Sequence, residues 1–592
     1  MAAPLVLGID LGTTNTCAAL LEGDRPRIIE TADGTTTMPS ALALGPEGQW
    51  LVGASALRQR ATRAQETIVG AKRLLGRPAE DIPHLQKDYP FELGPHGGSV
   101  GVRVGGVLYS VPELSAVVLE KVRQRAEAIV GQNIKDCVIT VPAYFNERQR
   151  QATRDAGLIA GFRVLKVLSE PTAAAVAYGS GRGANKRILV FDLGGGTFDV
   201  TIIETMEKRF RVLATGGDTR LGGQDFDRML VDVLAADFQK QTGIDPRTVP
   251  ASLGRLQEAA EKTKCELSTT VQSLVNLPFL AIVEGQPRHL ERQLNRALLE
   301  ELAQPLIARC LSTVKKTIAD AKVQPAQIDE VLFVGGMTRM PKIAEEVTKF
   351  TGKPPSKAIN PDEAVAMGAA LVGSWIAEEK AGELIDVVPL PLGLTLAGNV
   401  MGVLIGKNTP LPAKASKTYT TSKDAQTKIK IHVRQGESEE AKANALLGAF
   451  NLLLAEPQPR GKPQIEVTFE LDPNGILAVT AEEKGAGKRG KVLIRPQADY
   501  GAGVEEDYQQ ATQHAAEFAK AKADLVQVER LFADLGRGLD PDDRARVDEK
   551  LRALRAAILS EKLEETRRIL PEVMALGQAH MARLRAGGTS AG

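Results

Sequence analysis

Cysteine is scarce in this chain of 592 residues, and the four that occur stand far apart. Cys17, Cys137, Cys265 and Cys310 form no CxxC pair, so the sequence predicts neither a disulfide framework nor a zinc site. The six histidines are equally dispersed. We therefore expect a protein of a reducing, cytoplasmic compartment.

The chain also lacks an excess of charge of one sign and any long apolar run. Its formal net charge is +1, which gives no support to binding of nucleic acid or of a membrane surface. No segment approaches the roughly 18 apolar residues of a membrane span. The start, MAAPLVLGID, has no positively charged region of a signal peptide. The expectation is a protein with no nucleic-acid partner and no membrane association.

The residues that are present predict several folded units. A hydrophobic content of 43% supplies apolar surface for more than one core. Up to about residue 375, short β-rich runs alternate with helical patterns, for example a strand at 136–145 followed by a helix at 147–162. Such alternation is typical of mostly parallel sheets covered by helices.

Beyond about residue 388 the pattern changes twice. Strand-like alternation begins, as in KIKIHV at 428–433, and 463–481 reads as two strands joined at an Asn-Gly turn. Residues 504–586 are rich in Ala, Leu, Glu, Lys and Arg, which predicts helices; Asp540 is a candidate N-cap before Pro541. The predicted order is α/β, linker, antiparallel β, then α.

One phrase occurs twice in the α/β part. GIDLGTTNTCAAL at 8–20 and FDLGGGTFDVTII at 191–203 each consist of an apolar strand, Asp-Leu-Gly, a turn of small residues with Thr, and a second apolar strand. Asp10 matches Asp192, and Gly12 matches Gly194. The separation is too long for a solenoid repeat and indicates two duplicated lobes.

The chemistry of this phrase suits a phosphate. Glycine-rich turns expose backbone amides that form an anion-binding concavity, and hydroxyl donors are supplied by Thr13, Thr14 and Thr197. Acids beside a phosphate need a cation between them, and Mg²⁺ bound through its waters is the usual arrangement. The candidate water-mediated metal partners are Asp10, Asp192 and Asp199. The alternative is a pair of ordinary hairpins with glycine turns.

Other nucleotide-binding signatures are absent from the sequence. It contains neither GxxxxGK[ST] nor a GxGxxG that opens a helix, so it supports neither a Walker-type nor a Rossmann site. A third glycine element, VLFVGGMTRMPKI at 331–343, follows a predicted strand and precedes a predicted helix. It can bring backbone close to the sugar and base of a nucleotide.

Taken together, these motifs closely resemble the seventy-kilodalton heat-shock chaperones of the bacterial DnaK type, within the actin-like ATPases. The resemblance also rests on AKRLLGR (71–77), SEPTAAAVAYG (169–179), GDTRLGGQDFD (217–227), EAAEKTKCELS (258–268) and NPDEAVAMGAA (360–370). It implies a multidomain fold with these parts: a two-lobed actin-like ATPase domain at 1–376, an interdomain linker at 377–388, an antiparallel β-sandwich substrate-binding domain at 389–500, an α-helical lid at 501–586 and a flexible tail at 587–592.

The resemblance further implies an ATP-dependent chaperone that acts in protein folding and the stress response. Such a protein hydrolyses ATP to ADP and phosphate and thereby switches its affinity for extended hydrophobic segments of unfolded clients. The implied cofactors are ATP or ADP with Mg²⁺, and K⁺ as a further candidate ion. The implied partners are client peptides, a DnaJ-like J-domain co-chaperone and a GrpE-like nucleotide exchange factor, around a mainly monomeric chain.

Site residues follow from the resemblance, position by position. The implied catalytic residues are Lys72, Glu170, Thr197, Asp199 and Asp10, and Pro142 is implied as an interlobe switch. The implied nucleotide-binding residues are Gly12, Thr13, Thr14, Asn15, Gly194, Gly195, Gly196, Thr197, Glu261, Lys264, Ser268, Gly335, Gly336, Arg339 and Asp362. Glu261, Lys264 and Ser268 are spaced by threes and fours, so they share one face of a predicted helix.

The peptide-binding half is implied in the same way. The residues that match the family's hydrophobic cleft are Leu394, Ala397, Tyr419, Ile429 and Ile431. Alternation alone does not separate such a cleft from a sandwich core. The family usually has a larger residue at the position of Ala397, which implies a more open cleft here. The linker residues Leu384, Ile385, Asp386 and Val387 are expected to dock on the ATPase domain when ATP is bound.

Three alternatives remain at this point. A specialised member of the same family would handle a restricted client, for example an iron–sulfur scaffold protein. A small-molecule kinase on the same ATPase fold would leave residues 390–586 without a role. A nucleotide-dependent filament protein would need self-complementary surfaces.

Overall fold

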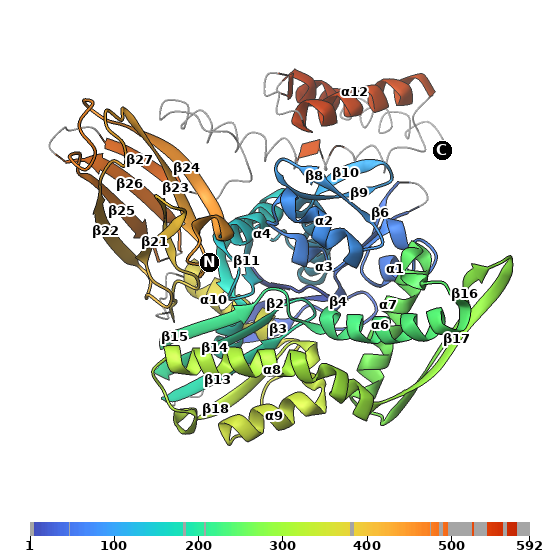
Figure 1. The fold of residues 1–592 in the computed structure, drawn as a ribbon. Coiled ribbons are helices and arrows are strands. Elements are labelled where there is room, and N and C mark those ends of the chain that lie inside the picture. The colour runs from blue at the N-terminus through green and yellow to red at the C-terminus, as the bar shows by residue number, and fades with distance from the viewer. Residues whose placement is uncertain are drawn as a thin grey trace. The chain divides into compact units, whose positions relative to one another are not determined.

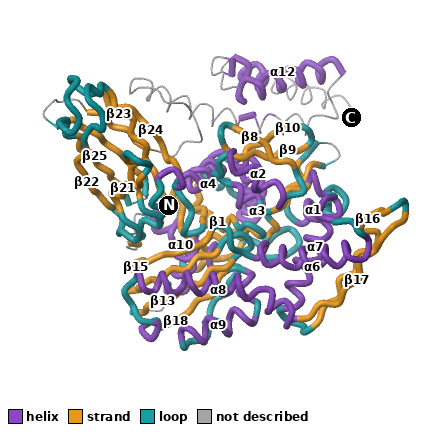
Figure 2. Tube along the Cα trace, in the orientation of Figure 1, coloured by secondary structure: helices purple, strands orange, loops and turns teal. Residues whose placement is uncertain are grey.

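The computed structural model describes residues 5–484 except 46–47, 181–184, 207–208, 379–383 and 474, and then 489–494, 524–525, 528, 541–559, 565–566 and 568–576 (Figures 1 and 2). Its internal contacts divide the chain into two units. One unit comprises Met1–Ala156 with Arg163–Tyr500, and the other comprises Gly157–Phe162 with Gly501–Gly592. Within the part of the chain described, no helix is both long enough and apolar enough to cross a membrane.

The first lobe of the large unit is built on one mixed sheet with the strand order β12-β11-β1-β2-β3, and β4 pairs with β2. All six residues of β11 are buried, as expected for a strand covered on both faces. β1 lies antiparallel to β2 and parallel to β11. The strands are β1 (Val6–Leu11), β2 (Asn15–Glu22), β3 (Arg25–Ile28), β4 (Met38–Pro39), β11 (Asp136–Val141) and β12 (Arg163–Ser169).

The second lobe repeats this arrangement. Its sheet has the order β18-β13-β14-β15-β19, with β13 antiparallel to β14 and parallel to β18. The strands are β13 (Lys186–Leu193), β14 (Phe198–Met206), β15 (Arg209–Asp218), β18 (Glu330–Val334) and β19 (Leu384–Ile385). The phrase that occurs twice in the sequence therefore forms equivalent hairpins in two equivalent sheets.

Two helices, α5 (Glu170–Gly179) and α10 (Ala364–Ala377), pack together in a core that both sheets share. That core contains Val6 of the first sheet and Ile188 of the second. At the crossing, a Cβ added to Gly368 would lie 1.8 Å from the carbonyl oxygen of Ala173. Only glycine permits the two helices to approach so closely.

Smaller elements surround the two sheets. Two three-stranded sheets have the orders β6-β5-β7 and β10-β9-β8, and β16 and β17 form a long hairpin (Figure 1). These strands are β5 (Ala41–Leu44), β6 (Trp50–Val52), β7 (Thr67–Val69), β8 (Glu92–His96), β9 (Ser99–Val104), β10 (Val107–Ser110), β16 (Gln272–Val283) and β17 (Gln286–Asn295). The helices and 3₁₀ turns are α1 (Ala54–Leu57), η2 (Ala71–Leu74), α2 (Ile82–Leu85), α3 (Val111–Val130), α4 (Glu147–Ile159), α6 (Gly223–Thr242), α7 (Pro250–Leu267), α8 (Arg296–Asp320), η7 (Gly336–Arg339) and α9 (Pro341–Thr351).

Residues after 388 form two antiparallel four-stranded sheets, β21-β20-β23-β24 and β22-β25-β26-β27. Buried residues alternate with partly exposed ones along β26, as a sandwich with one inner face per sheet requires. The strands are β20 (Leu392–Leu396), β21 (Val400–Ile405), β22 (Ala413–Tyr419), β23 (Lys428–Gln435), β24 (Ala445–Leu453), β25 (Ile465–Leu471), β26 (Leu477–Glu483) and β27 (Arg489–Ile494).

In the small unit, α12 (Pro541–Leu559) contributes Val547 and Leu554 to a core that also contains Val573. α12 begins at Pro541, the position predicted for the first helical residue. The candidate N-cap Asp540, most of the predicted lid at 501–586 and the tail at 587–592 lie outside the described residues.

Two of the predicted elements end earlier than the sequence suggests. The strand predicted at 136–145 ends at Val141, because Pro142 follows and cannot donate to the ladder. The helix predicted at 147–162 ends at Ile159, and Gly161 follows with a φ of 82°, a conformation that favours glycine.

Candidate functional site

The two hairpin turns meet face to face. A Cβ added to Gly195 would lie 2.0 Å from Thr14 Oγ1, and one added to Gly196 would lie 2.6 Å from Thr13 Oγ1. The first turn thus places hydroxyl groups directly against bare backbone of the second. Residues that the sequence separates widely form one continuous polar surface.

Two more glycine segments join this surface through backbone contact. A Cβ on Gly222 would lie 2.6 Å from backbone atoms of Gly196, and one on Gly335 would lie 2.5 Å from the carbonyl oxygen of Leu193. Gly335 has a φ of 80°, which favours glycine there as well. The third glycine element of the sequence is therefore adjacent to the second turn, as the site requires.

The three acids of the two hairpins occupy different positions. In the first hairpin Asp10 is opposite Cys17, whereas in the second Asp192 is opposite Asp199. Asp10 Oδ1 accepts a hydrogen bond of 3.2 Å from the Thr140 hydroxyl. Asp192 is 5% exposed and Asp199 is 1% exposed.

Among the described residues, one carboxylate oxygen of Asp199 has a hydrogen-bond partner and the other has none. Its Oδ1 accepts a 2.9 Å hydrogen bond from the backbone amide of Tyr144. Its Oδ2 is buried and has no hydrogen-bond partner among the described residues. A buried carboxylate oxygen without a partner is costly, so this atom indicates a missing cation or water ligand.

Burial and crowding raise the pKa values of all three acids. Withdrawal from solvent and then repulsion by Glu170 raise the pKa of Asp10 to about 7 and that of Asp199 to about 8. The pKa of Asp192 is raised well above its usual range by burial and then by Glu170, Asp199 and Asp10. Lys72 lowers each of the three values, though by less than burial raises it. The cluster therefore lacks positive charge.

This donor set fits a hydrated Mg²⁺. Among the described residues no group of three or more His, Cys, Asp or Glu side chains is arranged to hold a metal ion directly. Mg²⁺ keeps several of its waters and needs only one or two carboxylates. The open Asp199 Oδ2 and the deficit of positive charge are what such an ion would satisfy.

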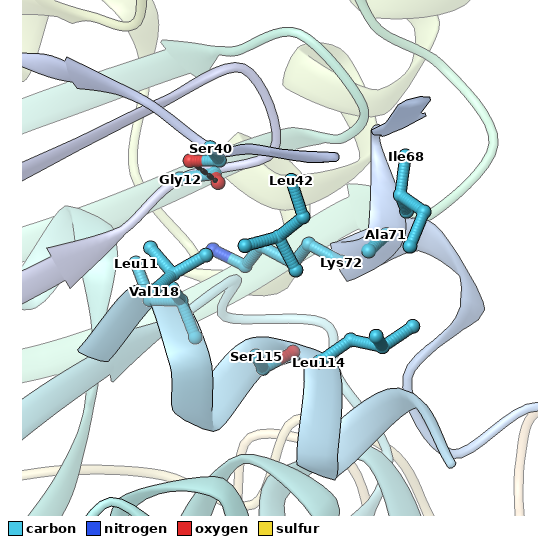
Figure 3. Close-up of a pocket in the computed structure, with 10 residues that line it drawn as sticks. All are labelled: Leu11, Gly12, Ser40, Leu42, Ile68, Ala71, Lys72, Leu114, Ser115 and Val118. Carbon is cyan, nitrogen blue, oxygen red and sulfur yellow. Dashed lines mark hydrogen bonds between the residues drawn. The ribbon is translucent and has the colours of Figure 1, made fainter. Parts of the chain in front are cut away.

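Two further predicted catalytic residues, Lys72 and Glu170, contact each other. Lys72 Nζ forms an ion pair with Glu170 Oε1, and both side chains are nearly buried. Figure 3 shows the aliphatic part of Lys72 between Leu42 on one side and the helix carrying Leu114 and Val118 on the other. This apolar surround fixes the ammonium group in the site.

Ser40, which the sequence did not suggest as a site residue, stabilises the first turn by hydrogen bonding. Ser40 Oγ donates a 2.8 Å hydrogen bond to the carbonyl oxygen of Gly12 (Figure 3). It also lies 2.8 Å from Thr16 Oγ1. Gly12 itself turns so tightly that a Cβ would lie 2.0 Å from the Asn15 carbonyl oxygen.

The predicted nucleoside residues of α7 are bound to neighbouring elements. Lys264 is 9% exposed, and its Nζ lies 2.7 Å from Asp227 Oδ1 and donates to the carbonyl oxygen of Gly223 at 3.2 Å. Glu261 Oε2 accepts from the Arg60 guanidinium at 3.3 Å. α7 is therefore anchored to both lobes rather than being a free surface helix.

The structure also gives the positions of four other predicted residues, Arg339, Asp362, Ser268 and Pro142. Arg339 forms an ion pair with Asp362, so these two predicted nucleoside residues are brought together. The Ser268 hydroxyl donates to the Lys264 carbonyl oxygen at 3.4 Å. Pro142 is buried directly after β11 and precedes the amide of Tyr144 that holds Asp199.

Several site residues were missed from the sequence. Arg73 donates to Asp225 Oδ2 at 2.8 Å and to Gln224 Oε1 at 3.2 Å, and so joins the lobes beside the turns. Asp227 pairs with Lys264. Both acids belong to GDTRLGGQDFD, so the motif was visible but the roles of its acids were not.

Comparison with known proteins agrees with this geometry. The family model for the Hsp70 protein matches residues 6–584. The chain is 44% identical over 582 residues, 96% of this chain and 92% of the relative, to "Chaperone protein DnaK" of Prochlorococcus marinus (strain MIT 9515). It is 44% identical over 575 residues, 95% of this chain and 87% of the relative, to "Heat shock protein hsp-6" of Caenorhabditis elegans.

The chain belongs to the Hsp70 family. Hsp70 proteins combine a two-lobed ATPase with a substrate-binding domain, and this chain is an ATP-dependent chaperone that hydrolyses ATP. The family, the chaperone function and the ATPase activity predicted from the sequence are confirmed.

In this Hsp70 chain, the residues predicted for the peptide cleft lie at one core of the sandwich. Leu394 and Ile431 are each 5% exposed and belong to that core. Tyr419 and Ile429 are partly buried and pack against it, whereas Ala397 is exposed. These side chains belong to or pack against the core, and a cleft would require the same alternation, so alternation alone does not separate the two interpretations.

The predicted linker residues extend the sheet of the second lobe. Leu384 and Ile385 form β19, which pairs parallel with Phe210 and Arg211 of β15. Val387 is 3% exposed and, with Leu384, packs against the core shared by the lobes. The Asp386 carbonyl oxygen accepts from the Leu411 amide at 2.9 Å, so the same segment also contacts the sandwich.

Polar contacts within the large unit join the ATPase lobes to the sandwich. Tyr144 Oη donates to Glu437 at 2.6 Å, and the Glu147 amide donates to Gln435 Oε1 at 2.8 Å. Lys407 lies 3.2 Å from Glu437. Tyr144 thus contacts Asp199 through its amide and the sandwich through its hydroxyl.

Proposed function

We propose that ATP binds where the two hairpin turns meet. In the folded lobes the Thr14 hydroxyl lies directly against the backbone of Gly195, a contact that we call the interlock. The interlock carries this proposal, because it joins amides and hydroxyls of both lobes into one anion-binding surface. The residues proposed to bind the phosphates are Gly12, Thr13, Thr14, Asn15, Gly194, Gly195, Gly196 and Thr197. Closure of the lobes around this surface would position the γ-phosphate for attack by water.

Catalysis in this proposal is mainly positioning and electrostatics, as in other phosphoryl transfers. Lys72 is freed from Glu170 and compensates charge on the phosphoryl oxygens. Glu170 and Asp199 orient the attacking water, and Thr197 donates its hydroxyl to the γ-phosphate. Asp10, Asp192 and Asp199 would hold Mg²⁺ through its waters, and the ion would supply charge neutralisation for the phosphates.

The nucleoside half of the proposal rests on the anchored helix α7. Lys264 is fixed by Asp227, and Glu261 by Arg60, so both side chains have defined positions. The residues proposed to hold the adenosine are Glu261, Lys264, Ser268, Gly335, Gly336, Arg339 and Asp362. K⁺ is a further candidate ion of this site.

We also propose that the chain is divided at the boundaries suggested by its sequence: ATPase domain 1–376, linker 377–388, sandwich 389–500, lid 501–586 and tail 587–592. The pairing of β19 with β15 supports a docked linker, with residues 384–387 released after hydrolysis. Pro142 would switch between the two states, because it precedes Tyr144, which contacts both domains.

In the sandwich, extended hydrophobic client segments would bind at Leu394, Ala397, Tyr419, Ile429 and Ile431. A J-domain co-chaperone and a GrpE-like exchange factor are the proposed partners of a mainly monomeric protein. All four cysteines are free thiols, which suits a reducing cytoplasmic compartment.

The experiment that tests this proposal has two steps. Calorimetric titration with Mg-ATP and Mg-ADP measures binding at the turns; Gly195→Ala should abolish the heat. Release of a fluorescent apolar peptide is then timed with each nucleotide. Rapid release with ATP and slow release with ADP is the expected result, whereas equal rates would contradict the switch.

A further inference from the structure

Three buried polar atoms of the sandwich have no hydrogen-bond partner among the described residues. They are Tyr419 Oη, Thr421 Oγ1 and Gln426 Oε1. An unsatisfied buried hydroxyl or carbonyl forgoes its hydration without compensation, and such groups are rare in folded proteins. Three of them occur within eight consecutive positions, which makes this segment a candidate for contact with a ligand.

Strand register places all three at one end of the sandwich. β20 and β21 join through the turn 397–399, since Leu396 pairs with Val400. β23 runs antiparallel to β20, so its start at Lys428 lies at that same end. The segment 420–427 leads into Lys428 and therefore lies there too.

Backbone hydrogen bonds tie this segment to the same end of the second sheet. The Gly461 amide donates to the Thr421 carbonyl oxygen at 3.2 Å, and the Ala425 amide donates to the Gln458 carbonyl oxygen at 2.9 Å. Tyr419 is the last residue of β22 and pairs with Ile465, the first residue of β25. The unpaired atoms thus belong to the end that carries the proposed peptide cleft.

Exposed apolar side chains mark the rim of this end, and Tyr419 lies deeper. Val400 is 51% exposed and Leu453, which pairs with Lys428, is 63% exposed. Tyr419 packs against the sandwich core, and its hydroxyl oxygen is buried. Burial also raises the pKa of Tyr419, so the phenol is a neutral donor and acceptor at physiological pH.

We propose that the Tyr419 hydroxyl, with Thr421 Oγ1 beside it in the sequence, selects client segments whose central side chain carries a hydroxyl or an amide. The inference rests on the proposed peptide site and deepens it. The client side chain would supply the hydrogen bond that the cleft lacks, while flanking apolar residues cover Val400 and Leu453. A site built around a polar group rejects an analogue that leaves this group unpaired.

The test uses two seven-residue fluorescent peptides that are identical except for the central residue, which is Val in one and the isosteric Thr in the other. With the ADP-bound full chain, the Thr peptide should bind more tightly than the Val peptide by about fivefold to tenfold, the value of roughly one recovered hydrogen bond. In Tyr419→Phe this preference should disappear. Thr421→Val should reduce it, and Thr418→Val, on the exposed side of β22, should leave it unchanged.

Stability measurements separate recognition from a structural role. Because the Tyr419 hydroxyl has no partner among the described residues, Tyr419→Phe should leave the thermal midpoint of the peptide-free protein unchanged or raise it. A lower midpoint, or an unchanged Thr-to-Val ratio, would overturn the inference. If the unaltered chain binds neither peptide, the proposed cleft itself is wrong; if it binds both equally, only the selectivity fails.

Discussion

The two hairpins that form the proposed ATPase site have the same fold but different chemistry. The first turn carries hydroxyls, and the second is bare glycine where those hydroxyls touch it. The first hairpin sets Asp10 opposite a thiol, Cys17, whereas the second sets Asp192 opposite another acid, Asp199. The two hairpins share a shape, and their different residues allow the turns to interlock and concentrate acids on one side.

This asymmetry adds to the electrostatics of the site. Burial and then Glu170 raise the pKa of Asp192, and Asp199 across the strand pair raises it further. Lys72 comes from the first lobe and lowers the pKa of acids in both hairpins. A cation from the first lobe thus compensates the acids of the second hairpin in part.

The largest expected effect on stability comes from removing the charge of Lys72. In Lys72→Met, buried Glu170 loses its partner, so the free energy of unfolding should fall by about 3–5 kcal/mol, the usual cost of breaking a buried pair. Denaturant unfolding measures it. The double variant Lys72→Met/Glu170→Gln should recover most of the stability without recovering ATP hydrolysis. Recovery of both would remove Lys72 from the catalytic role.

Breaking the interlock between the turns should have the next largest effect on stability. Gly195→Ala drives a Cβ toward Thr14 Oγ1, and overpacking of this kind costs about 1–3 kcal/mol. ATP hydrolysis should fall by about a hundredfold, since the phosphate groups would be misplaced by roughly an ångström. Unfolding and phosphate-release assays measure the two effects.

The neighbouring glycine provides a matched control for stability. A Cβ on Gly194 would lie 3.9 Å from its nearest neighbour, the Thr197 carbonyl oxygen, so Gly194→Ala should unfold like the unaltered chain. Adding Thr14→Ala to Gly195→Ala should restore part of the lost stability. If Gly194→Ala and Gly195→Ala are equally unstable, the interlock is not the cause.

The acid pair of the second hairpin makes stability depend on pH. In the folded protein without nucleotide the pKa of Asp199 is about 8, against a usual value of 3.8, so between these values the folded state binds more protons than the unfolded state. The free energy of unfolding must then fall as pH rises through this window. We expect the thermal midpoint to drop by a few degrees, on the order of 1 kcal/mol or more, from pH 6 to pH 8.5.

Asp199→Asn serves as the comparison for this pH effect. It removes the raised group, so the slope should flatten. A slope identical to that of the unaltered chain would show that Asp199 is ionised throughout the range.

The smallest expected effect concerns the contact between the lobes that Arg73 makes with Asp225 and Gln224. Arg73 contacts Asp225 and the neutral Gln224, and Gln224→Glu would give it a second carboxylate. Partly exposed pairs contribute about 0.2–1 kcal/mol, so release of a fluorescent ADP should slow by about twofold to fivefold. High salt should abolish the difference. Faster release would mean that the added acid repels Asp225 more than it attracts Arg73.

The sequence predicts the parts of this molecule that depend on local pattern. Both hairpins, the glycine element at 331–343 and helix α7 lie where their motifs place them, because strand, turn and helix signals act over a few residues. It does not predict contacts between distant segments. Thr14 against Gly195, Lys72 with Glu170 and Arg73 with Asp225 each join residues that only the folded lobes bring together.

The sandwich shows the same limit in another form. Ile429 and Ile431 alternate with lysines in the sequence and face the core in the structure, but a core and a cleft require the same alternation. The end of the sandwich that carries Tyr419 is distinguished by a buried hydroxyl with no hydrogen-bond partner among the described residues. A pattern of apolar residues in the sequence does not reveal such a group.

The contact of α5 with α10 at Gly368 has a mechanical consequence. With no side chain at residue 368, the backbone of α10 approaches the Ala173 carbonyl oxygen of α5 more closely than any other residue would allow. Sliding the two helices apart would open a void in the core that both sheets share. We therefore expect this crossing to act as a pivot when the lobes move, and one added methyl group there, as in Gly368→Ala, to force the two helices apart.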